Sequence, residues 1–242
     1  MNSYLRFVGE SVLSGNLRST RVLDVVPRQF VIAGWTGRDA KAIQHHIHEL
    51  AQLGVPPPSA VPLYYRASAS LLTQSNTIET LGAESSGEAE PILFFADGEW
   101  WLTVGSDHTD RKVETYSVAV SKQMCPKPIA SMAWRWSDVV QYQDDLQLRS
   151  RILEEGQWVD YQKGSLASIR PLESLRDDCV RAQITDAKRE GFFVSCGTLG
   201  ALTNPQGVGI RPASQMELEI FDPHWDRSIV YRYSVRPLPV VA

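Results

Sequence analysis

Residues 87–111 read GEAEPILFFADGEWWLTVGSDHTDR, and this stretch predicts a β-hairpin. Two apolar runs, 91–96 and 99–104, flank the dipeptide Asp97-Gly98, which favours the tight turn of a hairpin. Residues 105–111 then leave the open end of this hairpin, close to the point where residues 87–90 enter it. Side chains from the two segments are therefore expected to meet.

Three carboxylates lie at this open end. Glu88 and Glu90 are two residues apart, so an extended strand places both on one face, and Asp107 returns beside them. Three carboxylates without a nearby thiolate form an all-oxygen site, which suits Mg²⁺, Mn²⁺ or Ca²⁺ better than zinc. The alternative is that Glu88 and Glu90 are solvated charges at a strand edge.

Composition and charge limit the classes of function. The chain has 242 residues and a net charge of -4, and the absence of any Lys/Arg run argues against a nucleic-acid partner. No apolar segment approaches the roughly 18 residues of a membrane span, and the N-terminus lacks the features of a signal peptide. Three scattered cysteines are read as reduced. We expect a cytoplasmic protein that binds neither nucleic acid nor a membrane.

A helix is predicted over residues 39–53, because Asp39 is a good N-cap and apolar residues follow at helical spacing. Its polar flank carries three histidines and a glutamate. His46 and Glu49, three apart, can contact each other, and such a dyad can act as a general base. The alternative is a solvated helix face.

Short apolar runs predict a mainly β protein with a few helices, an α+β class. Arg66, in the strand predicted over 61–69, suits an anion or an ordinary surface ion pair. The loop 197–200 follows a buried strand at 192–195 and can meet an oxyanion. We also expect a strand or short helix at 112–119, helices at 137–143 and 171–189, and strands at 4–33, 146–153, 157–162, 216–221 and 228–235.

Several stretches resemble, in the same order, the fumarylacetoacetate hydrolase superfamily. They are His46-x-x-Glu49, VPLYYRASASLL (61–72), GEAEPILF (87–94), SDHTDR (106–111), Lys122, Gln162-Lys163-Gly164-Ser165 and CGTLGAL (196–202). The resemblance covers about residues 34–238. It implies one domain, 1–242, built on a rolled mixed β-sheet or barrel, with a smaller N-terminal β segment at 1–33 and a catalytic core at 34–242.

The resemblance also implies a homodimer that binds Mg²⁺ or Mn²⁺ and a small carboxylate substrate; Ca²⁺ is a further occupant expected in crystals. It places the metal on Glu88, Glu90 and Asp107. Catalytic roles fall to His46, Glu49 and Lys122. Substrate contacts fall to Arg66, Arg111, Gln162 and Thr198.

The function expected from this resemblance is hydrolysis of a C–C bond in a small 2-oxo acid or β-diketone, such as an acylpyruvate. Water activated by His46 and Glu49 would attack the distal carbonyl and release a metal-bound enolate. Alternatives on the same site are a decarboxylase, hydratase or isomerase of 2-oxo acids, or a hydrolase of another small carboxylate compound. A binding protein with the same fold is the non-enzyme alternative.

The chain departs from the family pattern at several positions. Arg66 replaces a lysine, Leu199 a proline and Ser106 an asparagine. Spacing leaves open whether Lys122 or Lys127 is the functional lysine, and His45 or His48 could face the site instead of His46. A weaker hypothesis, a structural subunit, rests on seven tryptophans that include the exposed-looking pair Trp134 and Trp136. The favoured interpretation of these side chains is core or a homodimer face.

Overall fold

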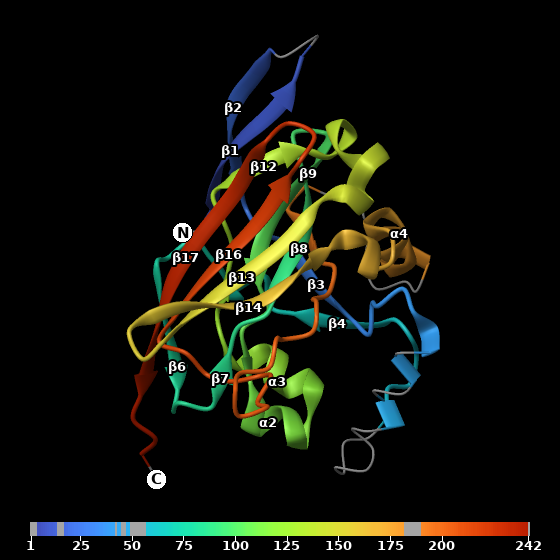
Figure 1. Ribbon diagram of the computed structural model, residues 1–242. Coiled ribbons are helices and arrows are strands. Elements are labelled where there is room, and N and C mark those ends of the chain that lie inside the picture. The colour runs from blue at the N-terminus through green and yellow to red at the C-terminus, as the bar shows by residue number, and fades with distance from the viewer. Residues whose placement is uncertain are drawn as a thin grey trace.

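The computed structural model describes residues 4–13, 17–41, 43–44, 47–48, 57–181 and 190–241. Two β-sheets face each other across a shared core (Figure 1). The larger has the strand order β2 (Arg18–Val25), β1 (Leu5–Val12), β12 (Met132–Arg135), β9 (Glu99–Ser106), β8 (Ala89–Ala96), β15 (Phe192–Ser195), β3 (Gln29–Gly34) and β4 (Leu63–Ala67). The smaller has the order β14 (Gln157–Ser165), β13 (Gln147–Glu154), β16 (Gln215–Asp222), β17 (Arg227–Leu238) and β6 (Thr77–Leu81).

Two further sheets each consist of two short strands. They pair β7 (Ser85–Ser86) with β10 (Thr109–Asp110), and β5 (Leu72–Thr73) with β11 (Lys127–Pro128). The α-helices are α2 (Arg111–Tyr116), α3 (Val118–Met124) and α4 (Leu172–Arg181), and the 3₁₀-helices are η1 (Ala69–Leu71), η2 (Trp136–Asp138), η3 (Val140–Asp145) and η4 (Leu166–Ser168). Parallel and antiparallel pairs both occur in the larger sheet. The predicted mixed, mainly β architecture is confirmed.

The predicted hairpin is strands β8 and β9, which pair in register from Ala89–Ser106 to Ala96–Glu99. Its turn has positive φ angles at Asp97 (51°) and Gly98 (76°), the pair of left-handed conformations that a two-residue turn requires. Both strands read as continuous apolar runs because both faces are covered. Leu93 and Leu102 lie in the core between the sheets, whereas Phe94 and Trp101 lie in a second core on the other face.

Residues 112–119 resolve into two short helices. Asp110 caps α2 by accepting a hydrogen bond from the Val113 amide at 2.9 Å. Ser117 caps α3 in the same way. These helices lie at the end of the molecule to which the β8–β9 hairpin opens (Figure 1).

Trp134 and Trp136 are core residues, with exposures of 1% and 3%, which agrees with the favoured interpretation of this pair. Trp134 lies on β12, inside the larger sheet between β1 and β9, and Trp136 begins η2. One expectation about residues 137–143 is wrong. The α-helix expected at 137–143 is instead the pair of 3₁₀-helices η2 and η3. Val139 leaves helical geometry between them (φ -121°, ψ -16°) and is completely buried. Tertiary packing here overrides the local helical pattern.

Helix α4 starts where predicted, after Pro171, and its described residues end at Arg181. Strands β13 to β17 match their predicted positions closely. Across the described ranges, no helix combines the length and the apolar character needed to cross a membrane.

Candidate metal centre

The open end of the β8–β9 hairpin brings three carboxylates together. Glu88 lies just before β8, Glu90 lies within it, and Asp107 lies just after β9. The Asp107 amide donates a hydrogen bond to the Glu88 carbonyl at 3.0 Å, which fixes the two segments side by side. One oxygen from each carboxylate lies within 4.8 Å of the others. The predicted convergence is confirmed.

These carboxylates are not solvated charges at a strand edge. Glu90 and Asp107 are 3% and 1% exposed, and Glu88 is half-buried. All three line a cavity of about 1030 Å³. The other predicted site residues on its wall are Arg111, Lys122, Gln162 and Thr198.

Of the three carboxylates, Glu90 is the one whose ionised form is most disfavoured by its surroundings. Burial, together with the neighbouring charges of Asp107 and Glu88, raises the pKa of Glu90 to about 8. Its Oε2 atom accepts hydrogen bonds from Ser195 Oγ at 2.5 Å and from the Gly197 amide at 3.2 Å. A bound divalent cation would remove the penalty on the ionised form.

Asp107 is held between two lysines. Lys122 Nζ lies 2.5 Å from Oδ2 and Lys127 Nζ lies 2.8 Å from Oδ1. Burial disfavours the charged carboxylate, but the two ammonium groups outweigh it and hold the pKa of Asp107 well below its ordinary value. Lys122 lines the cavity, whereas Lys127 is completely buried and also donates to the His108 carbonyl at 2.5 Å. Of the two, only Lys122 is among the residues that line the cavity.

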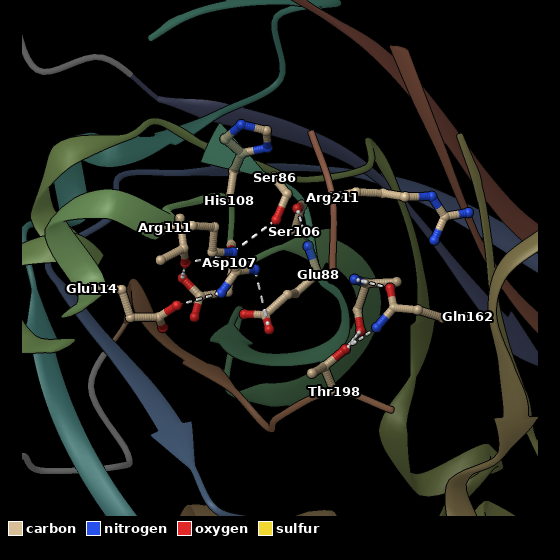
Figure 2. A network of polar contacts seen from close by, with 12 residues as sticks. Ser86, Glu88, Ser106, Asp107, His108, Arg111, Glu114, Gln162, Thr198 and Arg211 are labelled. Atoms are coloured by element: carbon tan, nitrogen blue, oxygen red, sulfur yellow. Dashed lines mark hydrogen bonds and ion pairs between the residues drawn. The ribbon is translucent and has the colours of Figure 1, made fainter. Parts of the chain in front are cut away.

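Two nitrogens of Arg111 donate hydrogen bonds, and the third lies beside a carboxylate without one. Nε donates to Ser86 Oγ at 2.7 Å, Nη1 donates to Glu114 Oε2 at 2.8 Å, and Nη2 lies 3.2 Å from Glu88 Oε1. Burial opposes the charge of the guanidinium, but Glu88 and Glu114 more than compensate and raise the pKa of Arg111 above its ordinary value. Figure 2 shows Arg111 and Glu114 together on one side of Glu88.

Gln162 and Thr198 lie on the other side of Glu88 (Figure 2). Gln162 Nε2 donates to Thr198 Oγ1 at 2.6 Å and to the Leu199 carbonyl at 2.7 Å, while its Oε1 accepts from the Ala89 amide at 2.9 Å. Thr198 Oγ1 in turn donates to the Ala89 carbonyl at 2.7 Å. This network ties the loop 197–200 to the strand that carries Glu90.

His46 and Glu49 fall outside the described residues, as does His45. In the described part of the predicted helix, helical residues begin at Ala40, and Asp39 caps this start by accepting from the Lys41 amide at 2.8 Å. Arg66 is exposed on β4, at the edge of the larger sheet, and is not among the residues lining the cavity.

Two residues that the sequence analysis did not single out also belong to the site. Glu114 lines the cavity and contacts both Arg111 and Lys122. His108, beside Asp107, is buried, and burial lowers its pKa to about 3, so its ring is neutral. Its nitrogens lie 2.9 Å from Tyr233 Oη and 3.0 Å from Ser85 Oγ. The spacing of three from Arg111 to Glu114, once placed on a helix, is the signal that identifies Glu114.

Comparisons with known proteins identify a family and several solved structures of similar fold. The family model described as "Protein of unknown function (DUF2848)" matches residues 33–233. No curated protein matches the chain. Among solved structures, 2-keto-3-deoxy-D-arabinonate dehydratase in its apo form is similar with a TM-score of 0.61 and 13% identity, over 92% of this chain and 78% of the dehydratase.

Two further structures resemble the chain. The same dehydratase complexed with magnesium and 2,5-dioxopentanoate has a TM-score of 0.55 and 14% identity, over 90% of this chain and 77% of the other. Cg1458 has a TM-score of 0.59 and 13% identity, over 90% of this chain and 80% of the other. Both proteins are members of the fumarylacetoacetate hydrolase superfamily, so the resemblance seen in the sequence is confirmed for the fold.

Proposed function

We propose that this chain, which belongs to the DUF2848 family of proteins of unknown function, is a divalent-metal-dependent enzyme that hydrolyses a C–C bond in a small 2-oxo acid or β-diketone. One observation carries the proposal. Glu88, Glu90 and Asp107 converge within 4.8 Å on the wall of a cavity that also presents cationic side chains to a ligand. Such a combination suits an anionic molecule with oxygen donors.

The residues present fit a hard divalent cation. The donor set is entirely carboxylate oxygen, and Glu90 is a buried carboxyl whose ionisation needs a compensating positive charge. Mg²⁺ or Mn²⁺ would be held by Glu88, Glu90 and Asp107. When bound, the ion would polarise the substrate oxygens and stabilise negative charge that develops on them.

The remaining side chains have separable roles in this proposal. Lys122 faces the cavity and would orient an anionic oxygen of the substrate, while Arg111 holds Glu88. Gln162 and Thr198 would fix the loop 197–200, whose Gly197 amide donates to Glu90. His46, held by Glu49, would take a proton from water and so supply the base that hydrolysis requires.

A dehydratase or another lyase acting on a 2-oxo acid is the second candidate function. The similar solved structures favour it, since they include 2-keto-3-deoxy-D-arabinonate dehydratase and its complex with magnesium and 2,5-dioxopentanoate. A binding protein without turnover is the non-enzyme alternative. These possibilities give different products on the same metal site.

Assays of the purified protein distinguish these candidate functions. The compounds to test are acylpyruvates, β-diketones, oxaloacetate and 2-keto-3-deoxy acids, each with Mg²⁺ or Mn²⁺ and with a chelator. Uptake of water to give one carboxylic acid and one ketone or 2-oxo acid supports the hydrolase, loss of water the dehydratase, and release of CO₂ a decarboxylase. Glu88→Ala should abolish metal binding. His46→Ala should abolish hydrolysis while metal binding is retained. Saturable metal binding without turnover of any compound would support the binding protein.

Two broader predictions accompany the proposal. A homodimer and a cytoplasmic location are expected from the resemblance and the composition. A light-scattering mass of twice the 27.1 kDa of one chain would agree with the first, and a mass of one chain would contradict it.

A further inference from the structure

We infer that Glu114 sets the charge of the ligand that the metal-loaded cavity accepts and selects a substrate with a single carboxylate. This inference rests on the proposed function and deepens it. Glu114 lies in the first turn of α2 and lines the cavity. Its carboxylate is 27% exposed, compared with 15% for Glu88 and 1% for Asp107, so a ligand can approach it.

Two cationic side chains, Arg111 and Lys122, lie between Glu114 and the candidate metal ligands. Arg111 Nη1 lies 2.8 Å from Glu114 Oε2, and Lys122 Nζ lies 3.8 Å from Glu114 Oε1. The same two cations contact Glu88 at 3.2 Å and 3.7 Å. Glu114 is therefore separated from a metal ligand by one layer of positive charge. It does not belong to the group of carboxylates that can share an ion.

The charge of Glu114 contributes to the net charge of the site. The charged cluster consists of four carboxylates and three cations: Glu88, Glu90, Asp107, Glu114, Arg111, Lys122 and Lys127. Fully ionised, it carries one net negative charge, and a divalent ion turns this into one positive charge. Arg38, another cation on the cavity wall, is already paired with Asp144 at 2.7 Å. Asp39, a further carboxylate on the wall, accepts from the Lys41 amide at the N-terminus of a helix, where the positive end of the helix dipole counters its charge. The loaded site is thus matched to a monoanion.

Without the charge of Glu114, the loaded cluster would carry two positive charges and would suit a dianion. The rest of the cavity agrees with a ligand whose remaining part is uncharged. Apolar side chains line it beyond the cluster, among them Ile43, Val118, Leu199 and Ile210. The inferred substrate class is a 2-oxo monocarboxylate with an uncharged, apolar remainder, in preference to a dicarboxylate.

Two small chelators test this inference without relying on turnover. Oxalate and oxamate share one planar skeleton, but oxalate is a dianion and oxamate a monoanion. Their dissociation constants are measured by calorimetry on the Mn²⁺-loaded protein, and their ratio cancels changes in metal binding common to both. Glu114→Gln keeps a hydrogen-bonding partner for Arg111 and removes only the charge. It should shift the ratio about tenfold in favour of oxalate, as expected for one nearby charge.

The control is Glu155→Gln, which removes one negative charge from an exposed hairpin turn that does not line the cavity and should leave the ratio unchanged. Glu114→Ala should shift the ratio in the same direction as Glu114→Gln. An unchanged or reversed ratio in the Glu114 variants, with Mn²⁺ still bound, overturns the role of Glu114 alone. Absence of saturable Mn²⁺ binding by the wild-type protein contradicts the proposed function, and this inference falls with it.

Discussion

Lys127 is completely buried, and its ammonium group lies 2.8 Å from Oδ1 of Asp107. Lys122 approaches the other oxygen of the same carboxylate from the cavity. The two lysines are thus expected to have different roles, a structural one for Lys127 and a functional one for Lys122.

Replacing Lys127 by methionine should therefore destabilise the protein. The substitution leaves Asp107 Oδ1 and the His108 carbonyl without their buried partner, and breaking a buried ion pair costs about 3 kcal/mol. Urea denaturation of the metal-free protein measures this loss. Lys163→Met, which breaks an ion pair between side chains that are 59% and 55% exposed, is the control and should have little effect. Equal stability of the two variants would contradict the assignment.

Metal binding should release a proton below about pH 8. Burial raises the pKa of Glu90 to about 8, so the ion-free carboxyl is protonated at neutral pH, whereas a metal ligand must be ionised. Metal affinity should accordingly rise with pH up to about 8. Calorimetry with Mg²⁺ in buffers of different ionisation enthalpy counts the released protons. A pH-independent affinity without proton release would refute this.

The same shift makes the stability of the ion-free protein depend on pH. A carboxyl whose pKa is raised from 4.5 in the unfolded chain to about 8 binds its proton more tightly when folded. Its contribution is therefore fully present below pH 4.5 and is lost as the pH rises through 8. Glu90→Gln should remove this part of the pH dependence, which thermal denaturation across pH 5 to 9 would show.

Gly197 should not tolerate a side chain. It has a φ of 89°, and a Cβ there would lie 1.8 Å from Thr36 Oγ1. Gly197→Ala should therefore cost at least about 2 kcal/mol from strain and displacement of the loop that contacts Glu90. Gly156→Ala is the matched control, because Gly156 has a similar φ of 79° but open space around it. Equal melting temperatures for the two variants would exclude a steric requirement at Gly197.

Tyr233 is hydrogen-bonded to residues that flank the candidate metal ligand Asp107. Its hydroxyl lies 2.9 Å from His108 Nδ1 and donates to Ser106 Oγ at 3.0 Å, and Ser106 Oγ accepts from the Glu88 amide at 3.1 Å. Tyr233→Phe should lower the free energy of unfolding by about 1–2 kcal/mol and weaken Mn²⁺ binding about tenfold.

A neighbouring tyrosine on β17 provides the comparison. Tyr231 donates to the Ser75 carbonyl at 2.7 Å and has no contact with the metal centre among the described residues. Tyr231→Phe should lose stability without any change in Mn²⁺ affinity. If both variants bind Mn²⁺ like the wild type, Tyr233 has only a structural role.

The parts of this fold that the sequence predicts are those set by local signals. The Asp97-Gly98 turn and its two apolar flanks define β8 and β9, and this hairpin alone brings Glu88, Glu90 and Asp107 to one end. Antiparallel pairing with a two-residue turn fixes the register, so no long-range information is needed.

The parts that escape prediction depend on distant packing. Nothing near Trp134 in the sequence indicates that β12 is inserted between β1 and β9, which is what buries its side chain. The position of Glu114 on the cavity wall likewise depends on residues 111–116 forming a helix whose first turn faces the cavity. The exposure of Arg66 follows from the position of β4 at the sheet edge.

Whether Glu88, Glu90 and Asp107 hold one metal ion can be seen in a crystal of the protein soaked with Mn²⁺ and oxalate, from an anomalous difference map recorded at the manganese edge. We predict one strong peak coordinated by Glu88, Glu90 and Asp107, with oxalate on the same ion and Lys122 within hydrogen-bonding distance of the oxalate. A manganese peak elsewhere, or no peak between these three carboxylates at saturating Mn²⁺, would contradict it.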